Sequence, residues 1–289
     1  MKPVSLARLL VCVALLLPMA AIANPALWVV RNAHTTIYLF GTVHLLPNDA
    51  DWHYPALDKA LAASDSLTIE LADDDTATMQ SLVLQYGLDP THPLSDQLSA
   101  TENATLQQAA QSAGLPGGAQ TLQIMRPWLA ALTLTVQPLL KAGLDPAHGV
   151  DKLLKAQMLQ AGKPVNGMET SEQQIRMLAD LPPGVQLDFL RSALRDIDKG
   201  PTELTRLISA WKDGDTDNIA QLENDEIRRQ SPELYQRLLV QRNQAWAGKI
   251  ATMLQQPGTV FIAVGAAHLA GPDSVQAQLR KLGIEAARQ

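Results

Sequence analysis

The sequence predicts a single α/β domain whose mixed sheet is built from strands near both ends of the chain, with a large helical insertion between them. Two observations support this fold class. Short, β-prone apolar runs lie at residues 35–40 and 67–71 and again at residues 260–264. Between about residues 76 and 256, apolar residues recur mostly at helical spacing. β-rich ends around a helical middle favour one sheet that takes strands from both ends.

The strands are bounded by turn residues. Residues 27–30 and 35–40 flank a polar connection, which predicts a β-hairpin. Gly41 ends the second of these runs, and Pro47 prevents its continuation. The expected strands cover residues 27–30, 35–40, 67–71, 163–168 and 260–264, with an edge strand over residues 284–287.

The helices have recognisable start and stop signals. Ser171 and Gln174 suggest a capping box, and Ser231 followed by Pro232 supplies an N-cap and a favoured first helical residue. Gly283 ends the last helix. In the C-terminal half, helices are expected over residues 186–198, 202–213 and 232–256; another covers residues 55–64, near the N-terminus.

The first 23 residues read as a secretory signal peptide. Lys2 and Arg8 precede the apolar stretch 9–17, and a small-x-small pattern ends at Ala23. This apolar stretch is too short to span a bilayer as a helix. We therefore expect an exported chain, residues 24–289, that acts in the periplasm or outside the cell, with a segment retained as an uncleaved anchor as the alternative. Cys12 is the only cysteine, so the exported chain is expected to have no disulfide.

Charge excludes several classes of partner. The whole chain has 23 basic and 29 acidic residues, a net charge of −6. No basic run or aromatic-basic patch is present, which argues against nucleic acid and anionic lipid as partners. The longest apolar stretch after the leader, between Arg126 and Lys141, is interrupted by two prolines and is too short to span a membrane. A peptide or a small molecule is the expected substrate, with no membrane span in the exported chain.

The same short motif ends a strand near each end of the chain. Gly41 precedes His44 by three residues, and Gly265 precedes His268 by three residues. The carboxyl ends of parallel strands collect at one edge of an α/β sheet, where ligands bind. Glycine at this position permits a tight bend and a close backbone approach. The paired motifs therefore predict two histidines that face each other across a cleft.

Two glutamates share this placement at a strand end. Glu70 and Glu169 each follow an apolar run. Imidazole and carboxylate groups are ligands for zinc, manganese or cobalt, and an open coordination position activates water. A carboxylate outside the coordination shell can serve as a general base. His44, His268 and Glu70 are thus candidate metal ligands, and Glu70 and Glu169 are candidate catalytic carboxylates.

Simpler roles exist for each of these residues. A histidine at a strand end often only bonds to a neighbouring loop; Glu70 can form a salt bridge, and Glu169 can complement the next helix N-terminus. Arg126 and the pair Arg242-Asn243 are ambiguous: arginine can clamp a carboxylate or an oxyanion, but a helix-surface role is the default. The sequence has no Gly-x-Ser-x-Gly elbow, His-Glu-x-x-His helix or phosphate-binding glycine loop.

Three segments carry a resemblance to a known family. In chain order they are LWVVRNAHTTIYLFGTVHLLP, GKPVNGMETSEQQ and VFIAVGAAHLAGPDSV. Together they resemble the TraB/GumN family, which includes the Tiki proteins. The resemblance implies an α/β/α fold related to the erythromycin esterase and ChaN-like proteins. It also implies a metal-dependent protease that uses manganese or cobalt.

The resemblance carries over to particular positions. It implies metal-site roles for the two motifs, Gly41 with His44 and Gly265 with His268, and makes Glu70 the acidic partner. Glu169 matches a further family motif. Arg126 and Asn243 lie in segments that are similar to family motifs, and the resemblance implies that they support the substrate or the site.

These observations lead to one main hypothesis and two alternatives. The main hypothesis is a metal-dependent hydrolase, a peptidase by resemblance, with manganese or cobalt favoured and zinc as a further option. The first alternative is a non-catalytic exported protein that sequesters a peptide, a metal or a small ligand in the same cleft. The second is a helical interaction module with a vestigial site.

Overall fold

The computed structural model describes residues 24–47, 50–73 and 75–289; the predicted signal peptide lies outside the described residues. A six-stranded mixed sheet confirms the predicted α/β class, with the strand order β4-β3-β5-β2-β1-β6. The strands are β1 (Leu27–Arg31), β2 (Thr35–Thr42), β3 (Ser66–Leu71), β4 (Val165–Glu169), β5 (Gly258–Gly265) and β6 (Ala287–Arg288).

The register of the central strands aligns the two glycine motifs. β1 and β2 form the expected antiparallel hairpin, and β5 runs parallel to both β2 and β3. Gly41 pairs with Val264, and Thr42 pairs with Gly265. Both histidine loops therefore leave the same edge of the sheet, because parallel strands end on the same side.

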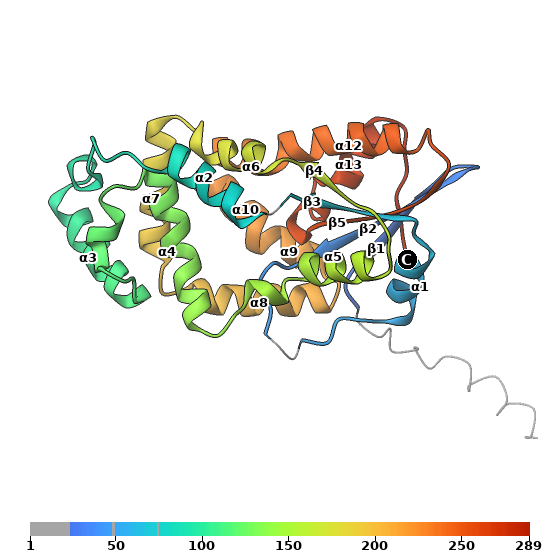
Figure 1. Ribbon diagram of the computed structural model, residues 1–289, viewed down its shortest axis with the longest axis horizontal. Helices are drawn as coiled ribbons and strands as arrows, with labels where there is room; N and C mark the ends of the chain where they lie inside the picture. The colour runs from blue at the N-terminus through green and yellow to red at the C-terminus, as the bar shows by residue number, and fades with distance from the viewer. Residues whose placement is uncertain (1–23, 48–49, 74) are drawn as a thin grey trace, which may run out of the picture.

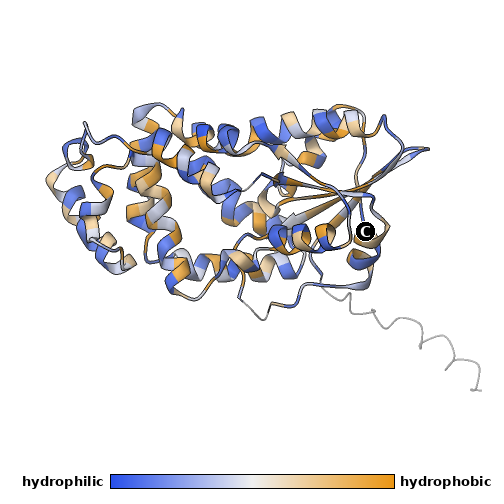
Figure 2. Cartoon of the chain, viewed as in Figure 1, coloured by the Kyte–Doolittle hydropathy of each residue, from blue (hydrophilic) through white to orange (hydrophobic). Residues whose placement is uncertain are grey.

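Helices cover both faces of the sheet (Figure 1). Phe40 on β2 packs on one face among Trp52 and Trp211, while Ile37 and Leu39 face the other side. Figure 2 shows that the strands between these layers are largely hydrophobic. α1 (Pro55–Ala63), α5 (Val150–Gln160) and α8 (Gly200–Lys212) lie on the first face; α12 (Gln241–Met253) and α13 (Val275–Lys281) lie on the second.

A helical region extends beyond the end of the sheet (Figure 1). Leu106, Ala110, Leu134 and Leu190 belong to its own buried apolar cluster. Its helices are α2 (Thr76–Gly87), α3 (Ala100–Ala113), α4 (Pro127–Lys141), α6 (Ser171–Ala179) and α7 (Pro183–Asp196), with the 3₁₀ turns η2 (Leu94–Gln97), η3 (Gly118–Leu122) and η4 (Pro146–His148). β4 lies between α5 and α6 in the chain, so the middle of the chain also contributes a strand to the sheet.

The expected helix over residues 232–256 is interrupted. Ser231 caps it as predicted and accepts a hydrogen bond from the Leu234 amide. The helix starts as α11 (Pro232–Tyr235), passes through a π-helical turn, η6 (Gln236–Val240), and continues as α12. A π-turn inserts one extra residue, so later side chains are rotated by about 100° relative to an uninterrupted α-helix.

A second π-helical turn, η5 (Ala220–Asn224), joins α9 (Thr216–Ile219) to α10 (Asp225–Gln230), and the 3₁₀ turn η7 (Ala266–Leu269) follows β5. Among the described residues, no helix has the length and apolar character needed to cross a bilayer.

Candidate active site

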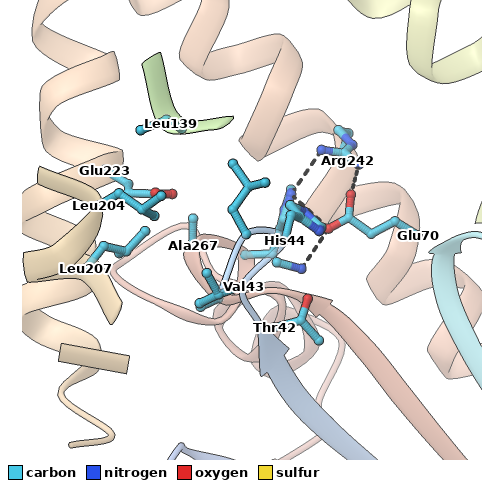
Figure 3. Close-up of a pocket in the computed structure, with 14 residues that line it drawn as sticks. Thr42, Val43, His44, Glu70, Leu139, Leu204, Leu207, Glu223, Arg242 and Ala267 are labelled. Carbon is cyan, nitrogen blue, oxygen red and sulfur yellow. Dashed lines mark hydrogen bonds and ion pairs between the residues drawn. The ribbon is translucent and has the colours of Figure 1, made fainter. Parts of the chain in front are cut away.

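A pocket of about 260 Å³ lies at the carboxyl ends of β2, β3 and β5. It contains both histidines of the paired motifs and Glu70, so the structure brings together the three predicted ligand residues (Figure 3). Apolar side chains from α4 and α8 form the opposite wall. The lining residues are Thr42, Val43, His44, Leu45, Glu70, Leu139, Leu204, Leu207, Glu223, Arg242, Gly265, Ala266, Ala267 and His268.

His44 is held at the mouth of the pocket by the start of α5. Its Nδ1 lies 3.0 Å from Oδ1 of Asp151. The Val150 amide donates to the carbonyl of Val43 at 3.0 Å, and a Cβ on Gly149 would lie only 2.6 Å from the carbonyl oxygen of His44. This close packing requires glycine at position 149. The arrangement leaves Nε2 of His44 turned toward Gly265.

The charge on His44 depends on its acidic neighbours. Desolvation in the pocket would lower its pKa, but the hydrogen bond to Asp151 and the charges of Glu70 and Glu223 outweigh this effect and raise the pKa to about 9. The side chain keeps 59% of its surface exposed, so solvent also reaches the imidazole. His44 is therefore an imidazolium at neutral pH when no metal is bound.

His268 has the opposite electrostatic character. Asn243 donates from Nδ2 to the carbonyl of Asp273 at 2.8 Å, so its Oδ1 accepts from Nδ1–H of His268 at 2.6 Å. Nε2 of His268 then carries the lone pair and accepts from Nη1 of Arg242 at 3.0 Å. Burial, together with the charges of Arg242 and His44, lowers the His268 pKa to about 3. His268 is thus neutral, with the tautomer that a metal ligand requires.

Arg242 connects the two predicted glutamates. Its Nη2 donates to Oε2 of Glu70 at 2.5 Å, and its Nε donates to Oε1 of Glu169 at 2.9 Å. The other oxygen of Glu70 accepts from the Gly265 amide at 2.7 Å. Burial opposes ionisation of Glu70. At the acidic pH where Glu70 titrates, however, the positive charges of both site histidines and Arg242 outweigh burial and hold its pKa at about 2.

Glu169 lies outside the pocket and contacts it through Arg242. It does not line the pocket; its carboxylate accepts hydrogen bonds from Arg242 and from Nε1 of Trp246 at 3.0 Å. The Trp246 ring lies against both Arg242 and His268. These contacts make Glu169 a positioning residue for Arg242.

The other predicted support residues differ in their placement. A Cβ on Gly41 would lie 3.1 Å from Cα of Ala266, so this glycine lets the His268 turn approach β2. Asn243 is fully buried against His268. Arg126 lies at the N-cap of α4, outside the pocket, and its amide bonds to the Gly87 carbonyl. Of the two candidates from the resemblance, only Asn243 contacts the site.

The default surface role for Arg242 was wrong. Its side chain is only 12% exposed. The π-turn before α12 changes which side chains face the sheet, and a continuous helical pattern does not reveal this. Sequence reasoning also missed Asp151 and Glu223. Asp151 contacts His44 across 107 residues of chain, and no local pattern signals that contact. Glu223 lies in a π-turn that the sequence did not indicate.

The donor groups fit a divalent metal in type. A Cβ on Gly265 would lie 3.1 Å from Oε1 of Glu70 and 3.6 Å from Nε2 of His44 and from Cδ2 of His268. The missing side chain thus leaves space among two imidazoles and a carboxylate, which suit zinc, manganese and cobalt. Within the described ranges, no three such side chains are already gathered closely enough to hold an ion. Arg242 would have to release Nε2 of His268 for a metal to bind there.

Comparison with known proteins identifies the family. The model of the TraB/PrgY/gumN family matches residues 26–288. The chain belongs to this family. The TraB/PrgY/gumN match extends from before β1 into β6 and includes every residue of the pocket.

Two bacterial relatives match most of the chain. YbaP of Escherichia coli strain K12 is 29% identical over 259 residues, which is 89% of this chain and 92% of YbaP. A protein of Treponema pallidum strain Nichols is 22% identical over 272 residues, 88% of this chain and 80% of that protein. The names of both relatives describe uncharacterized proteins. No solved structure matches the chain.

Proposed function

We propose that this member of the TraB/PrgY/gumN family is a hydrolase, with peptides as its favoured substrates. One observation carries the proposal. His44 and His268 come from opposite ends of the chain, and an oxygen of Asp151 or Asn243 holds Nδ1 of each ring. Oriented in this way, Nε2 of His44 is turned toward Gly265, and Nε2 of His268 would become available once Arg242 releases it. Metal-ligating and catalytic histidines are oriented by this kind of partner.

His44, His268 and Glu70 would hold a divalent metal, with manganese or cobalt favoured and zinc as a further option. The metal would lower the pKa of a water molecule and polarise the scissile carbonyl. Asp151 and Asn243 would keep the two rings in place, and Arg242 would orient Glu70 through its bond to Oε2. The donor types and the space beside Gly265 support this assignment.

The shape of the cleft favours an extended substrate. A second pocket of about 230 Å³ shares Thr42, His44 and Glu70 with the first and continues toward Lys152 and Gln174. The first pocket adds the side chains of Leu139, Leu204 and Leu207 to the shared residues, and the second adds Asp151, Lys152 and Gln174 beside Ile69 and Leu71. An extended peptide with an apolar side chain directed at the leucines matches two adjoining pockets better than a compact small molecule does.

Two finer inferences accompany the proposal. The helical layers on both faces of the sheet support a relation to the erythromycin esterase and ChaN-like fold. The pattern of the first 23 residues supports action outside the cytoplasmic membrane. Fractionation of cells that produce the full chain tests the location, and a cytoplasmic product of uncleaved mass would contradict it.

The function is tested with quenched fluorescent peptides that carry leucine at varied positions. The purified protein is assayed with manganese, cobalt or zinc, and with a chelator. We expect the protein to cleave peptides and the chelator to abolish this cleavage. The substitutions His44→Ala and His268→Ala should each reduce the cleavage rate by about 10²-fold or more. His92→Ala is the matched control, because His92 forms a similar pair with Asp89 (3.0 Å) outside the pocket.

Two outcomes would contradict the proposal. Undiminished cleavage by His44→Ala would show that the reaction does not take place at the assigned site. Saturable binding of the peptides without cleavage, with every metal, would favour the exported binding protein instead.

A further inference from the structure

Glu223 faces the same pocket from the helical side. It lies in the π-turn η5 and lines the pocket beside Leu204 and Leu207. In Figure 3 its carboxylate points into the space between these leucines and the loop that carries His44. Within the described ranges, no hydrogen bond or ion pair reaches this carboxylate.

The π-turn is rigidly attached to the His268 loop. Nδ2 of Asn224 donates to the carbonyls of Ala267 and Ala270, at 2.9 and 3.0 Å. Ala220, at the start of the turn, is buried in the core. π-turns are rare, and they occur frequently at functional sites. The position of Glu223 relative to His268 is therefore set by the fold and not by a mobile loop.

The environment of Glu223 differs from that of Glu70. Desolvation raises the pKa of Glu223, and the charge on His44 opposes this rise only partly. The other charged or titratable side chains of the pocket, Glu70, Arg242 and His268, are bonded to one another on the far side. The pocket thus holds one carboxyl group whose pKa is raised and one whose pKa is lowered. Two carboxyl groups with opposite shifts are a recurring arrangement in hydrolytic sites.

A structural role does not account for Glu223. A desolvated carboxyl group without a partner costs folding free energy, because it loses hydrogen bonds to water. Leucine or glutamine would fill the same space at a lower cost. The placement of an acid opposite the candidate ligands is therefore better explained by chemistry in the pocket.

We propose that Glu223 is the acid that protonates the leaving group in the hydrolysis proposed above. Water oxygen forms a bond to the acyl carbon, and the bond from that carbon to the leaving nitrogen breaks. The electron pair moves to nitrogen, which takes the proton from the Glu223 carboxyl. The proton lost by the attacking water then restores the Glu223 carboxyl group, so the cycle is balanced.

The test compares two probes with the same acyl group. N-acetyl-leucine p-nitrophenyl ester has a leaving group that departs without protonation, whereas N-acetyl-leucine methylamide requires it. We expect Glu223→Gln to lower hydrolysis of the amide by about 10²- to 10⁴-fold and that of the ester by less than about tenfold. Glu226→Gln, a change at a partly exposed site on α10, should match the wild type on both probes.

The two proposals fail in different ways. Equal losses on both probes, or no loss, would overturn the assignment of Glu223 and leave the hydrolase proposal intact. A wild-type protein that hydrolyses neither probe nor any peptide would overturn the hydrolase itself and, with it, this role for Glu223.

A measurement without substrate provides a second test. In protein labelled with ¹³C at the glutamate carboxyl carbons, the resonance that disappears in Glu223→Gln belongs to Glu223. We expect its titration midpoint to lie above the ordinary value of 4.5. A midpoint at or below that value would contradict the proposed acid role, whatever the activity of the enzyme.

Discussion

Arg242 donates a hydrogen bond to Nε2 of His268 across 3.0 Å, at the nitrogen that a metal ion would use. The same guanidinium bonds to Glu70 and Glu169 and lies 4.6 Å from the ring centroid of Trp246. A protein cation therefore organises the candidate ligands when no metal is present. Because its partners are buried carboxylates, its removal affects stability as well as the site.

Replacement of Arg242 by alanine should strongly destabilise the fold. The change leaves Glu70 and Glu169 buried without their cation, and breaking such a pair costs about 3–5 kcal/mol. Urea unfolding of the metal-free protein measures the loss. Arg191→Ala is the control, since Arg191 is 36% exposed and its ion pairs with Glu102 and Asp188 contribute no more than about 1 kcal/mol. Equal losses in the two variants would show that the Arg242 network does not stabilise the fold.

Metal binding near pH 7 should release about one proton per site, because His44 is the ligand that is protonated there. The pKa values of His268 and Glu70, about 3 and about 2, mean that these ligands have already lost theirs. Calorimetric titration with manganese or zinc, in buffers of different ionisation enthalpy, counts the protons. A count near zero would show that metal binding does not remove a proton from His44, which would contradict the prediction.

The stability of the metal-free protein should fall between pH 6.5 and pH 9. The folded state raises the pKa of His44 from 6.5 to about 9, so it binds more protons than the unfolded state in this interval. The stabilisation is complete below pH 6.5 and is lost as the pH rises through 9. Urea unfolding at both pH values should show a smaller fall in His44→Gln than in the wild type. His92→Gln is the control. If His44→Gln lost as much stability between the two pH values as the wild type, the raised pKa of His44 would be contradicted.

Gly265→Ala should remove metal binding and leave the fold intact. The new methyl group would lie 3.1 Å from Oε1 of Glu70, within the space among the candidate ligands. Gly265 has a φ of −48°, which alanine adopts without strain, so the loss of unfolding free energy should stay within about 1 kcal/mol. Metal affinity by calorimetry and urea unfolding measure the two effects separately.

The control for this change is Gly248→Ala. Gly248 lies within α12, and a Cβ there would contact nothing within 4 Å. Alanine should stabilise this helix by about 0.5–1 kcal/mol and leave metal affinity unchanged. Full metal affinity in Gly265→Ala would show that the ion binds elsewhere.

Much of the framework was readable from the sequence. The hairpin of β1 and β2 follows from two apolar runs around a polar turn, and its pairing is as expected. The same spacing separates Gly41 from His44 and Gly265 from His268. Because parallel strands end at one edge of a sheet, this repeated motif predicted that both histidines lie in the same region. Local patterns determine where strands end, and strand ends determine which side chains reach the edge of the sheet.

The partners of these residues could be known only from the tertiary structure. Asp151 reaches His44, and Arg242 reaches both glutamates, through contacts between segments far apart in the chain. Two π-turns set the directions of Arg242 and Glu223, and a helical period of 3.6 residues does not predict such turns.

The sequence by itself determined the α/β class and the residue types at the strand ends, since these depend on local spacing and composition. Its resemblance to relatives identified the family. The charge states of His44, His268 and Glu70 were decided by the folded structure. Desolvation and neighbouring charges act through space, and the neighbours that matter come from β3, α5, η5 and α12.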